Sequence, residues 1–300
     1  SNAMRYFITF SYDGSKFKGY QKQPKGRTVQ GEIEKVLKKI NSNKDISISA
    51  SGRTDAGVHA YNQKAHFDMD KTIDLDKLKN SLNGLLPKDI YVKNVEIVDD
   101  NFHARFNVKA KEYIYKINMG EYDPIKKDYV YQYNKKLDVV EMERAMKYLE
   151  GTHNFKSFTK NEEDYEDYER TIVQTSIIRN MKNINDITLC FLGTGFLRYM
   201  VRNMVGVLIE IGEGKRKSED IMDILEANDR CKAGKTAPPE GLYLKDVFYW
   251  WNSLTIAIKF SIILIGTFYI PLCGAWDTSQ SILEREKSYE KYIHAKKRRN

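Results

Sequence analysis

Hydrophobic residues recur with two different periods along the first hundred residues, and the order of these periods restricts the fold. Strict alternation, as around Tyr6, Ile8 and Phe10, is typical of a strand, whereas spacings of three and four residues are typical of an amphipathic helix. The patterns predict strand, helix, strand, strand, helix and strand in turn, at residues 5–11, 28–40, 46–50, 63–68, 74–85 and 91–98. This is the ferredoxin-like order of elements.

The chain from about residue 109 to residue 249 repeats this alternation of strands and helices, without recognisable sequence repetition. Tyr113, Tyr115 and Ile117 alternate along a strand, and a helix from Asp138 to about Leu149 is stopped by Gly151. Further elements are predicted at residues 172–179, 187–191, 196–211, 218–226 and just before 249. The whole pattern therefore predicts an α+β fold.

One loop, SGRTDAGVHA at residues 51–60, presents an acid between two glycines. Gly52 and Gly57 flank Asp55, so the backbone can turn tightly and approach a ligand closely. If Arg53 and Asp55 share an extended segment, they point the same way, and a guanidinium beside a carboxylate favours its ionised form. An ordinary turn is the alternative, and spacing alone favours it, because Asp and Gly cluster in turns for local reasons.

Two further side chains invite a functional interpretation. The predicted helix at 196–211 is almost wholly apolar, yet it carries Arg198 and Arg202. A charge inside such a helix needs a partner, unless Arg202 reaches the surface at the helix edge. Tyr113, judged by composition alone, is a core or cross-strand aromatic residue.

The segment from residue 16 to residue 44 is strongly basic. It carries nine Lys and Arg residues against Glu32 and Glu34, with Phe17 and Tyr20 interleaved. Such a cluster suits phosphate contacts and base stacking, although a solvated surface is the plainer interpretation of any single lysine. The net charge of +8 and the pI near 9.0 suit a polyanionic partner, either a nucleic acid or an anionic membrane surface.

Several classes of protein do not fit the sequence. Three scattered cysteines are too few for a disulfide framework or a zinc site, and the five histidines show no metal-binding spacing, so no metal is expected. There is no Walker loop or dinucleotide fingerprint. Without a secretory signal before the first strand, a reducing cytoplasm is expected. Residues 1–3, ahead of Met4, look like the remnant of a purification tag.

Motifs along most of the chain resemble those of the TruA-type transfer-RNA pseudouridine synthases. The loop at 51–60 matches the family's signature at nearly every position, and the other similar stretches are 17–24, 102–106, 110–116, 200–203 and 237–244. The resemblance implies two ferredoxin-like α/β-sandwich halves that share one antiparallel sheet, the pseudouridine synthase fold, with a basic cleft between them. The expected halves are 4–108 and 109–249, followed by an extension at 250–300.

The resemblance also implies an activity and its residues. The reaction would be the isomerisation of uridine to pseudouridine in the anticodon stem-loop of tRNA, at positions 38–40, with an extruded base and no cofactor, because the reaction is redox-neutral. The implied catalytic residues are the nucleophile Asp55, with Arg53 beside it and Arg202 reaching it, and Tyr113 would lie against the target base. Implied RNA contacts come from Lys18, Gln21, Lys22 and Arg105.

The family also predicts a homodimer. Two other functions stay open at this point: a non-catalytic RNA-binding or tRNA-folding protein on the same fold, and a metal-free hydrolase with Asp55 as its base. The intact set of Asp55, Arg53, Tyr113 and Arg202 weighs against the first alternative. The second lacks an apparent partner acid at a fixed spacing.

The resemblance ends near residue 250. Residues 253–276 are apolar over about the length that a membrane-spanning helix needs. Lys259 near the start and Pro271 near the end shorten the uninterrupted run, so a strand or helix packed on the body or on a dimer mate is favoured over a membrane contact. Residues 282–299 read as a charged, solvated helix.

Overall fold

Both halves of the chain share a core order of strand, helix, strand, strand, helix and strand, to which the second half adds two short strands and a helix. A computed structural model describes residues 3–160 and 164–250. The first half contains β1 (Met4–Tyr12), α1 (Val29–Ile40), β2 (Ser49–Ala50), β3 (His59–Met69), α2 (Leu75–Leu85) and β4 (Ile90–Val98). The second half contains β5 (Ala110–Asn118), β6 (Tyr131–Gln132), α3 (Val139–Lys147), β7 (Gly151–Asn154), β8 (Glu169–Arg179), β9 (Asp186–Gly193), α4 (Met200–Gly212), α5 (Asp220–Ala227) and β10 (Leu242–Phe248). Short 3₁₀ turns lie at Gly14–Lys16, Pro124–Lys126, Lys156–Phe158, Arg230–Ala233 and Pro239–Gly241.

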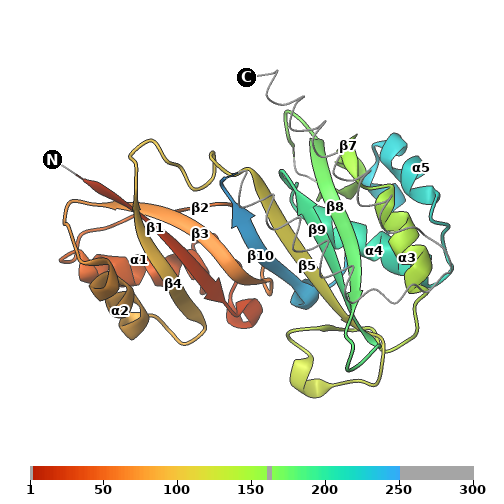
Figure 1. The fold of residues 1–300 in the computed structure, drawn as a ribbon, viewed down its shortest axis with the longest axis horizontal. Helices are drawn as coiled ribbons and strands as arrows, with labels where there is room; N and C mark the ends of the chain where they lie inside the picture. The colour runs from red at the N-terminus through yellow and green to blue at the C-terminus, as the bar shows by residue number, and fades with distance from the viewer. Residues whose placement is uncertain (1–2, 161–163, 251–300) are drawn as a thin grey trace. The chain divides into compact units, whose positions relative to one another are not determined.

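One continuous sheet runs through both halves in the order β4-β1-β3-β10-β5-β9-β8-β7 (Figure 1). The short strand β2 pairs with β3, and β6 pairs with β5. Each half therefore keeps the ferredoxin-like neighbours, β4-β1-β3-β2 in the first and β10-β5-β9-β8 in the second. The predicted fold of two ferredoxin-like halves on a shared sheet is confirmed.

The two halves meet along one edge of β3. Strand β2 pairs antiparallel with one end of this edge, opposite Ala65 and His66. At the other end, β10 runs parallel to β3, opposite His59 and Ala60. The sheet is therefore not wholly antiparallel as expected: β3–β10 and β5–β6 are parallel, and every other pairing in the described part of the chain is antiparallel. The loop at 51–58 enters β3 at this junction.

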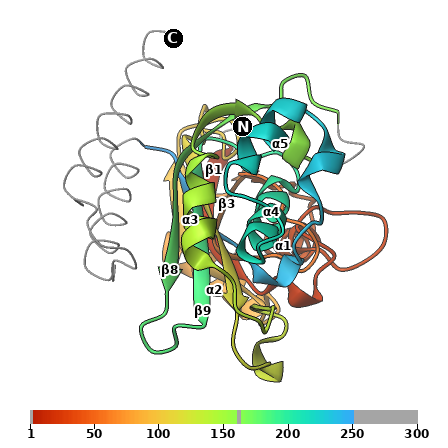
Figure 2. The same ribbon diagram turned by 90° about the vertical axis from the view of Figure 1, so that its right-hand side faces the viewer.

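The core of the first half lies between its sheet and its helices. Helix α1 begins at its N-cap Thr28, whose side chain accepts a hydrogen bond from the Gly31 amide, and it buries Val29, Ile33, Val36 and Leu37. Asp74 and Asp138, the residues at which the sequence places the start of these helices, cap α2 and α3 in the same way. Helices α1 and α4 lie on the same side of the sheet (Figure 2).

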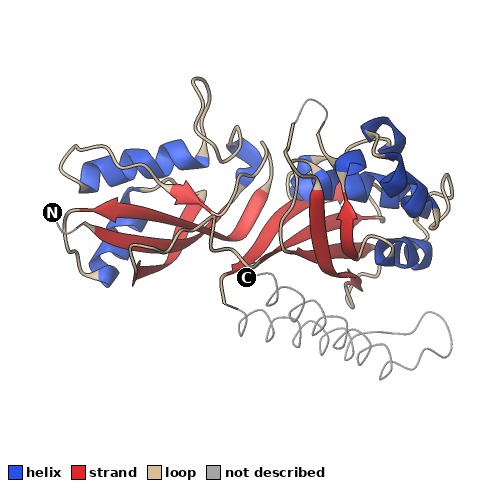
Figure 3. Cartoon of the chain, turned by 90° about the horizontal axis from the view of Figure 1, so that it is seen from above, coloured by secondary structure: helices blue, strands red, loops and turns tan. Residues whose placement is uncertain are grey.

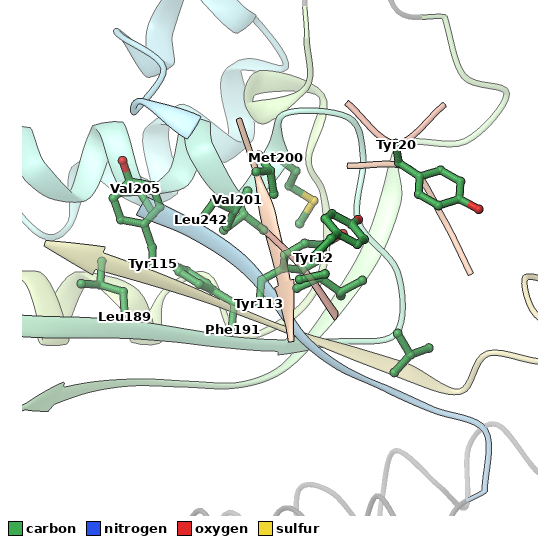
Figure 4. Close-up of a cluster of buried hydrophobic side chains, with 14 of the residues drawn as sticks. Tyr12, Tyr20, Tyr113, Tyr115, Leu189, Phe191, Met200, Val201, Val205 and Leu242 are labelled. Carbon is green, nitrogen blue, oxygen red and sulfur yellow. The ribbon is translucent and has the colours of Figure 1, made fainter. Parts of the chain in front are cut away.

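Helix α4 forms the centre of the second half's core. Its residues Met200, Val201 and Val205 are buried, as are the side chains that they face on the strands. These strand residues include Tyr115 of β5, Leu189 and Phe191 of β9 and Leu242 of β10 (Figure 4). The helices of this half gather on one face of its strands (Figure 3). A helix that is apolar nearly all round is stable here because it is buried nearly all round.

Several predicted elements have different bounds in the structure. The strand expected at 46–50 is reduced to Ser49–Ala50, because the Ile48 amide donates to Glu34 Oε2 at 3.1 Å rather than to a neighbouring strand. The helix expected from Phe196 begins at Met200, because Tyr199 before it has a left-handed backbone with φ of 66°. Helix α3 ends at Lys147 instead of Leu149.

The remaining predictions concern the boundary between the halves and the segments after residue 250. The expected boundary between the halves, at residues 108–109, lies directly before β5. The apolar segment 253–276 and the charged helix at 282–299 lie outside the described residues. No helix among residues 3–160 and 164–250 is long and apolar enough to cross a membrane.

Candidate active site

The loop that carries Asp55 is anchored from both sides. At its start, Ser51 donates from Oγ to Gln63 Oε1 at 2.6 Å. In its middle, the buried Thr54 hydroxyl lies 2.7 Å from Tyr12 Oη. After the acid, Gly57 adopts φ of 83°, a conformation that favours glycine. These contacts present the Asp55 side chain at the tip of the loop.

Two arginines flank the Asp55 carboxylate. Arg202 Nη1 lies 3.3 Å from Oδ2, and Arg198 Nε lies 3.8 Å from Oδ1. Arg202 is fixed in turn, because its Nε donates to the Ala237 carbonyl at 2.9 Å. The Asp55 side chain is 20% exposed and that of Arg202 12%, so the pair is sheltered while the carboxylate stays open to a ligand. The arrangement balances the charge of the acid and fixes its direction.

The residue after Arg202 fastens α4 to its surroundings. Asn203 is fully buried and donates from Nδ2 to the Phe158 carbonyl at 2.7 Å. Its Oδ1 accepts from the Thr236 hydroxyl at 2.6 Å and from Arg230 Nη2 at 3.0 Å. A buried amide with both ends bonded holds the helix in one register. The MVRN motif therefore combines the arginine of the site with its anchor.

Tyr113 of β5 forms one wall of the site. Its ring is 9% exposed and packs edge-on against Phe196, with ring centroids 5.0 Å apart. Burial raises the pKa of the Tyr113 hydroxyl, and the neighbouring Tyr12 and Asp55 raise it further. Figure 4 shows Tyr113 and Tyr12 among the buried side chains of this region. The wall is aromatic and uncharged, which suits contact with a planar base.

Arg53 does not accompany Asp55 in the way that the loop sequence suggested. The residues around it form no strand, its side chain is exposed, and its Nη1 donates to Gln21 Oε1 at 2.7 Å. The ion pairs of Asp55 within the described residues are those with Arg198 and Arg202. The guanidinium beside the acid therefore comes from the start of α4, about 150 residues away in sequence.

The basic segment at 17–24 lies against the Asp55 loop. The Tyr20 amide donates to the Thr54 carbonyl at 3.1 Å, and Lys18, Gln21 and Lys22 are exposed. Lys22 Nζ also lies 3.6 Å from Glu34. The sequence suggested that the aromatic rings of this segment could stack on bases. They cannot, because Tyr20 is 4% exposed and Phe17 is likewise buried.

Arg105 is the remaining predicted RNA contact. It is exposed in the turn before β5, and its guanidinium lies near enough to the Lys111 ammonium to lower the pKa of that group. The predicted site residues thus fall into two groups: Asp55, Arg202 and Tyr113 meet at the junction of the halves, whereas Lys18, Gln21, Lys22, Arg53 and Arg105 are exposed. Within the described residues, no group of three His, Cys, Asp or Glu side chains is placed to hold a metal ion.

Three contributors to this site were not identified from the sequence. Arg198 was noted only as a charge in the predicted helix, and it precedes α4, so helical spacing does not place it beside Arg202. No sequence pattern marks the other two residues. The ring centroid of Tyr199 lies 4.7 Å from the Arg202 guanidinium carbon, and Lys111 donates to the Ser51 carbonyl. Their positions depend on backbone turns that periodicity does not reveal.

Fold and site together define a class of protein. Two ferredoxin-like halves on one sheet are the pseudouridine synthase fold, and here an acid on the loop between β2 and β3 pairs with an arginine of α4 at the junction of the halves. The family model described as tRNA pseudouridine synthase matches residues 8–107 and 145–250. The chain belongs to the tRNA pseudouridine synthase family, whose members isomerise uridine to pseudouridine in tRNA.

Individual relatives are similar over the same region. The tRNA pseudouridine synthase A of Geobacillus sp. (strain WCH70) is 48% identical over 246 residues, which cover 82% of this chain and 98% of that protein. The enzyme of the same name from Oceanobacillus iheyensis is 47% identical over 251 residues, covering 83% and 98%. That from Lactobacillus helveticus (strain DPC 4571) is 44% identical over 247 residues, covering 82% and 94%.

Proposed function

We propose that Asp55 is the nucleophile of this isomerase. The observation that carries the proposal is the sheltered ion pair between Asp55 and Arg202, at 3.3 Å, next to an uncharged aromatic wall. The reaction breaks the bond between uracil N1 and ribose C1′ and forms a bond from C5 to the same C1′. N1 gains a proton and C5 loses one, so no electrons leave the system. A carboxylate that adds to C1′ or to the base divides this rearrangement into two easier steps.

The residues around Asp55 take supporting roles in this proposal. Arg202 holds the carboxylate in its reactive direction and balances its charge. The Tyr113 ring stacks against the uracil after the base leaves the helix stack. Phe196 and the apolar start of α4 exclude water while the base is detached, which prevents simple hydrolysis. Arg53 acts at the rim of the site, where Gln21 holds it.

The substrate proposed is the anticodon stem-loop of tRNA, with target uridines at positions 38–40. Support comes from the near-complete match of the loop at 51–60 to the signature of the TruA-type enzymes and from relatives named tRNA pseudouridine synthase A. Lys18, Gln21 and Lys22, exposed beside the Asp55 loop, and Arg105 would contact the RNA. Phosphate contacts of this kind position a nucleic acid without reading its sequence.

We also propose that the enzyme acts in the cytoplasm as a homodimer, as the resemblance to the TruA-type enzymes implies. A dimer would complete the cleft that holds one tRNA. Sedimentation equilibrium over micromolar protein concentrations tests the assembly, and a single species at the 35.0 kDa of one chain would refute it.

Release of tritium from tRNA labelled at uridine C5 tests the nucleophile, because C5 loses its hydrogen only if the new bond forms there. Asp55→Ala and Asp55→Asn should lower the rate at least about 1,000-fold and change tRNA affinity less than about threefold. Asp70→Asn, an exposed acid outside the site, is the matched control and should keep the wild-type rate.

The alternative to an enzyme is a non-catalytic RNA-binding protein on the same fold. Wild-type protein that binds tRNA but releases no tritium would favour this alternative. Wild-type release together with full release by Asp55→Asn would keep the isomerase and remove Asp55 as its nucleophile.

A further inference from the structure

Lys111 lies beneath the Asp55 loop. It precedes Tyr113 by two residues on β5, and alternate residues of a strand share a face, so both side chains project toward the site. Lys111 Nζ donates to the Ser51 carbonyl at 2.8 Å. Gly52 makes room for this contact, because a Cβ at that position would collide with Lys111 Nζ. The absence of a side chain at Gly52 thus leaves space for the Lys111 ammonium.

The ammonium of Lys111 has unused hydrogen-bonding capacity. It carries three N–H donors, and the Ser51 carbonyl takes one of them. No carboxylate of the described residues lies within ion-pair distance of it, although its side chain is partly buried. Burying a charge without a counter-charge is unfavourable, so a ligand usually supplies the counter-charge to such a group.

A second cation lies close to the first. The Arg105 guanidinium, exposed in the turn before β5, also has no carboxylate partner among residues 3–160 and 164–250. Burial lowers the pKa of Lys111, and Arg105 lowers it further, to about 8. At neutral pH the lysine is therefore still charged, and neither cation has an acid within ion-pair distance among the described residues.

Two other strand cations of the protein have acid partners. Arg5 is bidentate to Asp68, and Lys245 lies 3.3 Å from Glu112 on the opposite face of β5. These pairs stabilise the fold without a ligand. Arg105 and Lys111 together form a positive site that the fold leaves uncompensated, next to the loop that carries Asp55.

We propose that Lys111 and Arg105 bind one phosphate group of the tRNA backbone next to the target nucleotide. A phosphate supplies the missing negative charge and several acceptor oxygens, and both side chains are donors only. Lys111 then bridges the phosphate and the Ser51 carbonyl, so that RNA binding fixes the Asp55 loop. The inference rests on the proposed placement of the target uridine beside Asp55.

The test is the salt dependence of tRNA binding, measured by filter binding with unmodified tRNA between 50 and 300 mM KCl. For Lys111→Gln, whose amide can still donate to the Ser51 carbonyl, affinity should fall about tenfold and the log–log salt slope should become shallower by about 1. Arg105→Gln should act in the same direction. The double variant should change the slope by no more than about 1, because both side chains hold the same phosphate.

Lys116→Gln is the matched control. It removes a lysine from the same strand on the opposite face, where its Nζ contacts the Tyr61 hydroxyl and overlies Tyr243. Affinity and slope should stay at the wild-type values.

Unchanged slopes for both Lys111→Gln and Arg105→Gln would overturn the proposal and leave Lys111 as a support for the loop. Because Arg105 is exposed, its variant keeps the fold, and an unchanged slope for Arg105→Gln overturns the shared phosphate site even if Lys111→Gln does not fold. The measurement reports binding and not turnover, so its result is independent of whether Asp55 is the nucleophile.

Discussion

At the scale of single residues, Tyr199 holds an uncommon backbone conformation directly before α4. Its φ of 66° and ψ of 1° lie in the left-handed region, where a bulky side chain is strained. Its ring is surrounded by cations, with the Arg202 guanidinium carbon 4.7 Å from the ring centroid, Lys160 Nζ at 5.4 Å and the Arg198 guanidinium carbon at 5.7 Å. Strain of this kind persists where surrounding contacts maintain it, often at functional sites. Tyr199 is therefore a positioning residue for the two arginines of Asp55.

Replacing Tyr199 with asparagine should change stability and activity in opposite directions. Tyr199→Asn relieves the strain, because Asn tolerates the left-handed region, and should raise the free energy of unfolding by about 1 kcal/mol. The same change removes the ring beside Arg202 and should lower kcat about tenfold. Tyr199→Phe keeps the ring and should retain wild-type turnover. Urea denaturation and tritium release measure the two effects, and an Asn variant with full activity would show that the ring has no part in the site.

The residues of this site are unequally recognisable in the sequence, for physical reasons. Asp55 between two glycines, and Arg202 in an apolar helix, are conspicuous because each breaks the pattern around it. Their ion pair is present in the structure, whereas their catalytic roles stay predictions. The condition set for Arg53, a strand shared with Asp55, is not met because residues 52–55 form no strand, and the catalytic role of Arg53 stays a prediction. Phe17 and Tyr20 looked exposed because the segment is basic, yet both rings are buried.

At the scale of elements, α4 packs closely against the chain that precedes β10. The Ala237 amide donates to the Arg202 carbonyl at 3.0 Å, and Gly206, one turn later, faces the Lys235 carbonyl. A Cβ on Gly206 would overlap that carbonyl oxygen. The close approach also brings the Ala237 carbonyl within reach of Arg202 Nε, so helix packing and the geometry of the arginine depend on the same contact.

Gly206→Ala should therefore destabilise the protein. Forcing the helix and the 235–237 segment apart should lower the free energy of unfolding by about 1–3 kcal/mol, as overpacking does elsewhere. Gly84→Ala in α2 is the matched control, because nothing lies within 4 Å of its added Cβ. That change should stabilise by about 0.5–1 kcal/mol, since alanine favours the helix. Equal stabilities of the two variants in urea would refute the close-packing argument.

Most elements were predictable because their hydrophobic periods are clear and their caps are explicit, as at Thr28, Asp74 and Asp138. The exceptions are elements that tertiary contacts decide. Glu34 of α1 takes the Ile48 amide and so shortens β2. The parallel pairing of β10 with β3 joins segments about 180 residues apart, and no local pattern specifies such a partner.

At the scale of the whole molecule, two neutral histidines of β3 link distant parts of the chain. His59 accepts the Gly14 amide at Nδ1, at 2.9 Å, and its Nε2 lies 2.7 Å from the Asp128 carbonyl, so it connects the first half to the second. His66 Nδ1 accepts the Ala104 amide at 3.0 Å. Burial lowers the pKa of His59, and burial followed by Arg5 and His103 lowers the pKa of His66 to about 4.

The protein should consequently lose stability in mild acid. Because the folded-state pKa of His66 lies below its value of about 6.5 in the unfolded chain, the unfolded state takes up protons first as the pH falls. Stability is complete above about pH 6.5 and should fall by on the order of 1–2 kcal/mol between pH 7 and pH 5. Urea denaturation at both pH values measures the change. His66→Asn, which keeps an acceptor for the Ala104 amide, should reduce it, and an equal loss in this variant would exclude His66 as its source.

The parallel pairing of β3 with β10 also means that β3 is synthesised well before its partner strand. Leu242, the first residue of β10, follows Met69, the last of β3, by 173 positions, the difference of the two residue numbers. At about 5–20 residues per second, a ribosome takes roughly 10–35 seconds to cover that distance. During this interval the His59 end of β3 is an open strand edge, which is a template for pairing with another nascent chain. The protein is therefore most exposed to aggregation while it is being made, and β10 closes that edge only after these further residues have been synthesised.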